Sequence, residues 1–388
     1  MADVPSRIGV VGAGTMGAGI AQLGALAGIE TVLHDPVAEA LEKGATGVHA
    51  NLDKGTERGR WSADDAAIAH GRLTTAASLD GLSGCELVIE AAPERLDLKR
   101  ELFERLSEIC DPGTVLATNT SSIPVTQIAS AAAEPENVLG LHFFNPAPLM
   151  KLVEVIAALQ TGERALAIAR ATGEAMGKRV IDAGDGPGFL VNRCGRPFSS
   201  EALRLLQEGL ATHERIDWIY RVGGGYRMGP FELMDLVGID VGFAVAKSFM
   251  ELSFGEPRWK PNPLQARMAA SGRLGRKTGR GWYDYSGDGP YRPDDDPDAS
   301  LDDRDAQLLH RVQSCIVNEA AFALGEGVGS AEDIDAGVKL GLNWPKGSIE
   351  LGRELGFDRV LAEIDRLYDF YREDRYRAAP LLRSGALS

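Results

Sequence analysis

One histidine and one carboxylate stand out as a pair that could move a proton. His142 follows an apolar run at 139–141, and Glu154 lies among apolar residues in the next strand-like run. If these two runs form a hairpin centred on Pro148, residues whose numbers sum to 296 face each other, which pairs His142 with Glu154. A carboxylate fixes the tautomer of a histidine and stabilises its protonated form. The pair therefore suits a general base that accepts a proton from an alcohol.

Two alternatives stand beside that interpretation of His142. One is a structural hydrogen bond to Glu154 that closes the hairpin. The other is metal ligation, which the sequence does not favour because no second histidine or cysteine stands at ligand spacing from His142. We therefore expect no metal site. The remaining histidines lie in polar contexts or directly before an acidic residue, namely His34, His49, His70, His213 and His310.

Glycines spaced G-x-G-x-x-G follow the first apolar strand-like run. Gly12 allows a tight turn, Gly14 lets the backbone approach a ligand, and Gly17 permits close packing of a helix on the strand. A pyrophosphate would then lie at the helix N-terminus. Asp35 ends the next strand-like run, near the spacing of a ribose-binding carboxylate, and would repel a 2′-phosphate, which favours NAD over NADP. The alternative is an ordinary glycine-rich turn with Asp35 in a solvated loop.

Composition limits the class of protein. The 388 residues are 44% apolar, which is enough for two or three hydrophobic cores. A net charge of −15 argues against nucleic acid or an anionic membrane as partner, although a small polyanion can still bind where cations gather locally. No apolar run approaches the roughly 20 residues that span a bilayer. Because there is no signal-like segment and no C-x-x-C pair among Cys85, Cys110, Cys194 and Cys315, we expect a cytoplasmic protein.

The elements that must position these residues alternate between strands and helices over the first half of the chain. Helical stretches such as 98–109 separate strand-like runs at 7–11, 31–34, 86–90, 115–118, 138–144 and 151–156. This alternation is typical of a doubly wound α/β sheet of the Rossmann type, which binds ligands at the carboxyl ends of its strands. After residues 185–188 the sequence is helical throughout. We therefore expect a dinucleotide-binding domain over 1–185.

The helical half contains an internal repeat. An offset of 118 residues relates seven residues to identical ones without a gap: Glu201, Gly209, Asp217, Gly229, Glu232, Gly238 and Asp240. Two homologous helical domains are therefore expected, at 186–290 and 304–388, joined by an acidic linker at 291–303. A helical unit that cannot cover its own apolar face can cover it with a copy of itself. The duplication is thus first a packing device.

Several motifs in a fixed order closely resemble those of the L-3-hydroxyacyl-CoA dehydrogenases, over essentially the whole chain. The matching segments lie at 12–17 (GAGTMG), 119–122 (NTSS), 142–146 (HFFNP), 151–155 (KLVEV), 187–193 (PGFLVNR) and 228–233 (MGPFEL). The resemblance implies an NAD-dependent oxidoreductase of fatty acid metabolism, including β-oxidation, that converts (S)-3-hydroxyacyl-CoA to 3-oxoacyl-CoA reversibly. Other interpretations are a related enzyme for a non-CoA 3-hydroxy compound, such as a sugar acid or carnitine, and a cofactor-binding protein without catalysis.

The resemblance also implies roles for individual residues. His142 would be the base, Glu154 its orienting partner, Ser121 a hydrogen-bond partner of the substrate oxygen, and Asn192 a residue that places substrate and histidine. The implied NAD contacts are Gly12, Ala13, Gly14, Thr15, Met16, Gly17, Asp35, Glu94, Lys99, Ser121, Asn145 and Lys277.

Structural alternatives exist for several of these residues. Ser121 could cap the following helix, Asn192 could be an ordinary polar residue of a helix start, and Glu94 and Lys99 could be solvated helix charges. Lys277 could belong to a basic loop only.

The chain departs from the family pattern in its length. Short members end after one helical unit, and this chain has two, as long members do. The offset maps Asn192 onto His310, so the second copy lacks the asparagine and is expected to be structural. Either a monomer, as an internal pseudo-dimer, or a homodimer would result. Three cations, Lys43, Lys54 and Arg58, could meet the phosphates of CoA, although no family motif matches them residue by residue.

Overall fold

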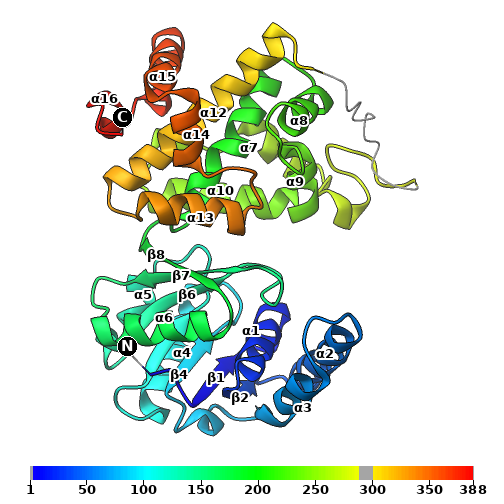
Figure 1. The fold of residues 1–388 in the computed structure, drawn as a ribbon, viewed down its shortest axis with the longest axis vertical. Coiled ribbons are helices and arrows are strands. Elements are labelled where there is room, and N and C mark those ends of the chain that lie inside the picture. Colours follow the sequence, from blue (N-terminus) through cyan, green and yellow to red (C-terminus); the bar gives the residue numbers. More distant parts are fainter. Residues whose placement is uncertain (1–2, 288–299, 388) are drawn as a thin grey trace. The chain divides into compact units, whose positions relative to one another are not determined.

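The computed structural model describes residues 3–287 and 300–387. It divides into two compact units, Met1–Phe189 and Leu190–Ser388. The first unit is an α/β sheet domain and the second is helical, as the sequence predicts (Figure 1). The division falls close to the expected boundary after residue 185. The expected acidic linker at 291–303 lies mostly outside the described residues.

The first unit is built on one eight-stranded sheet in the order β3-β2-β1-β4-β5-β6-β7-β8. All neighbouring strands are parallel except β6 and β7, which form an antiparallel hairpin. The strands are β1 (Arg7–Val11), β2 (Glu30–His34), β3 (Leu73–Ala76), β4 (Leu87–Glu90), β5 (Val115–Thr118), β6 (Val138–Phe143), β7 (Leu152–Ala157) and β8 (Arg179–Gly184). The helices are α1 (Thr15–Leu26), α2 (Ala38–Glu57), α3 (Ala63–Arg72), α4 (Leu96–Ile109), α5 (Val125–Ala129) and α6 (Glu163–Ala175), with 3₁₀ turns η1 (Leu79–Leu82) and η2 (Pro135–Asn137).

The apolar core of this unit lies between one face of the sheet and helices α1, α2, α3 and α6. Leu141 and Phe143 of β6 and Val153 and Val155 of β7 belong to this core. Because successive side chains of a strand point to opposite faces, the residues between them point to the other face. The strand pattern thus places the polar residues of these strands together, away from the main core.

The second unit contains both helical copies. The first comprises α7 (Val191–Gln207), α8 (His213–Val222), α9 (Pro230–Val237), α10 (Ile239–Leu252), η3 (Pro257–Trp259), α11 (Pro263–Ala270) and η4 (Arg276–Thr278). The second comprises α12 (Asp303–Gly325), α13 (Ala331–Gly341), α14 (Ser348–Leu355), α15 (Phe357–Tyr371), η5 (Asp374–Tyr376) and α16 (Pro380–Arg383). We propose that the two copies fold together as one unit.

The repeat is visible in local structure. Asp217 accepts hydrogen bonds from the first N–H groups of α9, and Asp335, its repeat equivalent, accepts them from the first N–H groups of α14. Gly238 and Gly356 both end those helices with positive φ, 104° and 84°, a conformation that side chains rarely adopt. The repeated residues therefore serve the same structural purpose twice.

Candidate active site

The hairpin of β6 and β7 brings His142 and Glu154 together. Its register pairs the two residues directly, as the sequence argument expects. His142 Nδ1 lies 2.6 Å from Glu154 Oε2, and the histidine and glutamate are 6% and 0% exposed. Both side chains project from the face opposite the main core because their strand neighbours belong to that core. A buried histidine is thus held in one orientation by a buried carboxylate.

Aromatic side chains surround the histidine ring. Phe144 and Phe189 lie with ring centroids 4.7 and 5.7 Å from that of His142. This apolar environment strengthens the electrostatic interaction of His142 with Glu154. Because Nδ1 faces the carboxylate, Nε2 is the ring nitrogen that remains for an external hydroxyl. The arrangement can accept a proton at Nε2 and stabilise the resulting cation through Glu154.

A second buried carboxylate lies on the same face, at the carboxyl end of β4. Glu90 is fully buried and accepts hydrogen bonds from Lys99 Nζ at 2.7 Å and from Thr118 Oγ1 at 2.7 Å. Lys99 is 1% exposed and also lies 3.4 Å from Glu94 Oε2. Its ammonium is therefore held inside the protein between two carboxylates. This burial leaves the direct NAD contact that the resemblance implies for Lys99 without support from its surroundings.

Glu94 organises the loop after β5. Its Oε1 accepts hydrogen bonds from Thr120 Oγ1 at 2.7 Å and from the backbone N–H groups of Ser121 and Ser122, both at 3.0 Å. Burial acts to raise the pKa of Glu94, but Lys99 and these hydrogen bonds outweigh it and lower the pKa below its ordinary value. Glu94 is thus an ionised loop anchor rather than a solvated helix charge.

Ser121 does not cap the helix that follows it. Helix α5 begins at Val125 with Pro124 in the N-cap position and without a side-chain cap, and its first N–H groups donate instead to Asp185. Ser121 itself is exposed, as is Asn145 in the loop between β6 and β7. Both side chains are accessible to ligands.

The glycine-rich segment has the properties that an anion cradle needs. Gly12 has φ 100°, and a Cβ there would lie 2.7 Å from a backbone oxygen of Ala91. A Cβ on Gly17 would lie 1.7 Å from the oxygen of Gly12, whereas Gly14 faces open space. Helix α1 starts after Gly14 without a side-chain cap and without an acidic residue in its first turn. Its first N–H groups are therefore suited to a pyrophosphate.

Asp35 is bonded to this segment. Its Oδ2 accepts a hydrogen bond from the backbone N–H of Ala13 at 2.9 Å, and its Oδ1 accepts one from Val37 at 2.9 Å. Asp35 also lines a groove of about 340 Å³ between α2 and the end of β3. A carboxylate offers about four acceptor positions, so Asp35 can still accept from a ribose hydroxyl.

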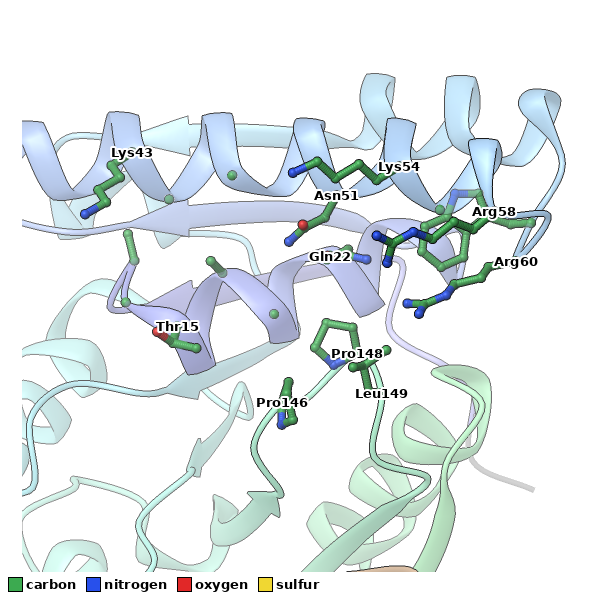
Figure 2. A pocket seen from close by; sticks show the side chains of 18 of the residues that line it. Thr15, Gln22, Lys43, Asn51, Lys54, Arg58, Arg60, Pro146, Pro148 and Leu149 are labelled. Atoms are coloured by element: carbon green, nitrogen blue, oxygen red, sulfur yellow. The ribbon is translucent and has the colours of Figure 1, made fainter. Parts of the chain in front are cut away.

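A larger pocket of about 700 Å³ lies between the glycine-rich segment with α1, helix α2 and the loop after β6. Figure 2 shows cationic side chains along one side of this pocket, on and after α2, and Pro146, Pro148 and Leu149 on the other. The cations are Lys43, Lys54, Arg58 and Arg60, and all four are exposed. No ion pair involves them within residues 3–287 and 300–387. On a chain of net charge −15, this cluster is a local concentration of positive charge, which would attract a polyanion.

The two remaining expected residues lie in the second unit. Asn192 occupies the first turn of α7 and lines a groove of that unit. Lys277 Nζ donates a hydrogen bond to Asp240 Oδ2 at 2.7 Å. Lys277 is therefore ion-paired with a residue of its own unit, which leaves its expected contact with NAD without support from its surroundings.

Sequence reasoning missed other residues that support the site. Glu90 and Thr118 end the successive strands β4 and β5 and are hydrogen-bonded to each other, and Asn119 Oδ1 accepts a hydrogen bond from the backbone N–H of Phe143 at 2.8 Å. A polar residue at the end of an otherwise apolar strand was the available signal. Arg60 was missed because nothing in its sequence context separates it from other surface arginines.

Comparison with known families gives a consistent result. The model described as 3-hydroxyacyl-CoA dehydrogenase, NAD binding domain, matches residues 7–186. The model described as 3-hydroxyacyl-CoA dehydrogenase, C-terminal domain, matches twice, over residues 188–285 and 308–386. The second match coincides with the second helical copy. Within the described residues, no helix is both long and apolar enough to cross a membrane.

Individual relatives agree with the family models. The chain is 36% identical to the 3-hydroxyadipyl-CoA dehydrogenase of Escherichia coli K12, with 98% of this chain and 97% of that protein covered. It is 38% identical to the human mitochondrial hydroxyacyl-coenzyme A dehydrogenase over 73% of this chain and 92% of that one. A crystal structure of a 3-hydroxybutyryl-CoA dehydrogenase from Escherichia coli K12 superposes with a TM-score of 0.91, at 35% identity over 99% of this chain and 98% of that one.

Proposed function

Because the chain belongs to the 3-hydroxyacyl-CoA dehydrogenase family, whose members oxidise a 3-hydroxyacyl-CoA to a 3-oxoacyl-CoA with NAD, we propose that His142 is the catalytic base and Glu154 its orienting partner. The observation that carries this assignment is the 2.6 Å contact between His142 Nδ1 and Glu154 Oε2. As the substrate is oxidised, Nε2 takes the hydroxyl proton and Glu154 stabilises the imidazolium. In the reverse direction the same nitrogen returns the proton.

The residues of the first unit fit NAD. When bound, NAD accepts the hydride from C3 of the substrate. The first N–H groups of α1, preceded by Gly12 and Gly14, would hold its pyrophosphate, and Asp35 would accept hydrogen bonds from the adenosine ribose. Glu94 and Asn145 would lie toward the nicotinamide half. The open space at Gly14 supports this placement because a side chain there would occupy the approach to the helix N-terminus.

Two further residues are proposed to act on the substrate. The exposed Ser121 would donate a hydrogen bond to the oxygen on C3, since its hydroxyl is not needed to cap α5. Asn192 would place the substrate beside the base. Its position in the first turn of α7, on the wall of a groove, supports this role over that of an ordinary polar residue.

The CoA moiety is proposed to bind in the pocket between α1, α2 and the loop after β6. Its phosphates need cations that are not already paired, and Lys43, Lys54, Arg58 and Arg60 are the exposed cations of that pocket. Pro146, Pro148 and Leu149 would contact the less polar part of CoA (Figure 2). This pocket argues against a sugar acid or carnitine as substrate because neither carries phosphates.

The proposal is tested by comparing substrates. With NADH, the wild-type protein should reduce acetoacetyl-CoA, followed as loss of absorbance, and should be inactive on 3-oxo sugar acids and dehydrocarnitine. Lys54→Met and Arg58→Met should each raise KM for acetoacetyl-CoA by about 3- to 10-fold, as loss of one phosphate contact predicts, without raising KM for acetoacetyl-pantetheine. Arg100→Met, an exposed arginine on α4, is the control. Equal increases of KM for acetoacetyl-CoA and acetoacetyl-pantetheine would show that the CoA phosphates do not bind in this pocket.

The cysteines bear on the cellular compartment of the protein. The four cysteines are free, which supports a reducing compartment such as the cytoplasm.

The names of two relatives do not agree on the acyl group of the substrate, because one specifies a 3-hydroxyadipyl and the other a 3-hydroxybutyryl group. One of these acyl groups ends in a methyl and the other in a carboxylate.

A further inference from the structure

A groove of about 230 Å³ lies within the second unit, between α7, α9 and α10. Most of its wall is apolar, including Leu203, Leu233, Val237 and Val241. Such a wall suits a hydrocarbon chain, because removal of CH₂ groups from water is favourable. Helix α7 adds a polar strip to the apolar wall, formed by Asn192, Arg196, Ser199 and Ser200. These residues determine which chemical group at the end of such a chain can bind.

Arg196 is the charged residue of that strip. It is partly buried, its guanidinium lies 4.7 Å from the ring centroid of Phe249, and its buried Nε makes no hydrogen bond within the part of the chain that the structure describes. Arg196 also has no ion pair there, in contrast to Arg193 and Arg204 on the same helix, which pair with glutamates. Burial lowers the pKa of Arg196 to about 10, so it stays cationic at neutral pH.

The charge in this groove is of one sign. Lys260 is exposed at the same groove, and among the described residues that line it there is no aspartate or glutamate. A partly buried cation without a counter-ion is costly unless a ligand supplies the anion. The planar guanidinium binds carboxylates and phosphates in two parallel hydrogen bonds, and of these a carboxylate is the anion that can end a hydrocarbon chain lying on the apolar wall.

The spacing along α7 relates this cation to the proposed reaction centre. Arg196 follows Asn192 by four residues, so both lie on one face of the helix and both line the groove, about 6 Å apart along the axis. If Asn192 places the carbon that is oxidised, the next turn of the helix lies only a few carbons further along the acyl chain.

We propose that this groove takes the acyl chain of a 3-hydroxy dicarboxylic acyl-CoA, and that Arg196 binds the carboxylate at the far end of that chain. The proposal rests on the proposed function, because Asn192 locates C3. It deepens that function by making Arg196 the residue that selects an acid-ended chain of about six carbons over a methyl-ended one.

The test compares two substrates that differ only at the chain end, 3-hydroxyadipyl-CoA and 3-hydroxyhexanoyl-CoA. The wild-type protein should have a higher kcat/KM for the acid-ended substrate. Arg196→Met should lower the ratio of the two kcat/KM values by about 100-fold, which is the expected loss when one partner of a hydrogen-bonded charge pair is truncated. Arg196→Lys, which keeps the charge without the two-pronged geometry, should lower the ratio less.

The controls separate this role from a structural one. Arg267→Met removes an exposed arginine on α11 that does not line the groove, and it should leave the ratio unchanged. Because Arg196 also stacks on Phe249, thermal unfolding of each variant checks the fold, and Arg196→Gln replaces Arg196→Met if the latter does not fold. A wild type that prefers the methyl-ended substrate, or variants that lower both kcat/KM values equally, would overturn the proposal. A wild type that oxidises neither these substrates nor 3-hydroxybutyryl-CoA would instead overturn the proposed function.

Discussion

Arg193 on α7 donates a hydrogen bond to Glu319 on α12 at 2.9 Å, and the repeat reverses the partners: Arg311 on α12 donates to Glu201 on α7 at 2.6 Å. The offset of 118 residues relates both arginines and both glutamates to each other. All four residues are at most 5% exposed. In a symmetric dimer, residue i contacts residue j of the partner and j contacts i. The two copies within this chain therefore pack as two subunits of such a dimer would.

These reciprocal pairs should be important for stability. Arg193→Met leaves the buried Glu319 with Arg258 as its remaining ion-pair partner, at 2.8 Å. Removal of one partner of a buried ion pair typically costs about 3–5 kcal/mol of unfolding free energy. Urea denaturation of the variant would measure this cost. The double variant Arg193→Met, Glu319→Gln should cost less than the sum of its single changes. Arg372→Met, which breaks an exposed pair with Asp369, should cost under about 1 kcal/mol. Additive costs in the double variant would contradict the pairing.

The second copy should also replace a partner subunit. Deletion of residues 304–388 would expose the face of α7 that packs on α12, so the shortened chain should dimerise or aggregate and lose activity although His142, Glu154 and Asn192 remain. Light scattering after size-exclusion chromatography measures the molar mass of the shortened chain, with the full chain at the same concentration as control. A shortened protein that is monomeric and fully active would show that the second copy has another purpose.

Acid should weaken one contact between the copies. Glu256 accepts two hydrogen bonds from Arg377, both at 2.7 Å, and two from Arg258, one from Nε at 3.1 Å and one from the backbone N–H at 3.2 Å. Burial acts to raise the pKa of Glu256, but the two arginines outweigh it and lower the pKa to about 2, below the ordinary value of 4.5. A depressed carboxyl pKa stabilises the fold above the unfolded-state pKa, and this stability is lost as the pH falls from about 4.5 toward 2.

Glu256→Gln should therefore be less stable than the wild type at pH 7, and the difference in unfolding free energy should shrink as the pH is lowered through that window. Urea denaturation at several pH values measures the difference. Glu354→Gln, on an exposed pair with Lys346, is the control. A difference that stays constant with pH would contradict the assigned pKa shift.

Cofactor choice should depend on Asp35. Asp35→Ala removes an acceptor for the ribose, a charge that repels a 2′-phosphate and a hydrogen bond to Ala13 of the glycine-rich segment. We expect a higher KM for NAD and a rise of about 10-fold or more in kcat/KM for NADP relative to NAD. Glu39→Ala, an exposed residue in the first turn of α2, should leave the preference unchanged. A wild-type protein that uses NADPH as readily as NADH would show this role of Asp35 to be wrong.

The sequence predicts the central strands better than the edges of the sheet. Strands β1 and β5 have the expected bounds because each is a short apolar run buried on both faces. The edge strands β3 and β8 were not expected, since Leu73–Ala76 and Arg179–Gly184 each contain several exposed or half-buried residues and no long apolar run. Edge strands need less apolar surface, so their pattern resembles that of a loop.

The site shows the same limit. The contact of His142 with Glu154 could be predicted because a hairpin register depends only on residues close in sequence. The burial of Lys99 between Glu90 and Glu94 could not, because it depends on how α4 packs beside β4 and on the loop after β5. The lack of a hydrogen bond at Arg196 Nε, among the described residues, could not be predicted either. Hydrogen bonds and ion pairs of such a residue depend on its tertiary neighbours rather than on the residues adjacent on the helix.

The most direct test of the account is the rate of acetoacetyl-CoA reduction by His142→Gln. Loss of a positioned general acid–base should lower kcat by about 10²- to 10⁴-fold while the Kd for NADH stays unchanged. Glu154→Gln should act through the same histidine, so the double variant should be little slower than His142→Gln alone. His310→Gln, on α12 of the second copy, should keep wild-type kcat. A His142→Gln protein that retains wild-type kcat would contradict the assignment of His142 as the base.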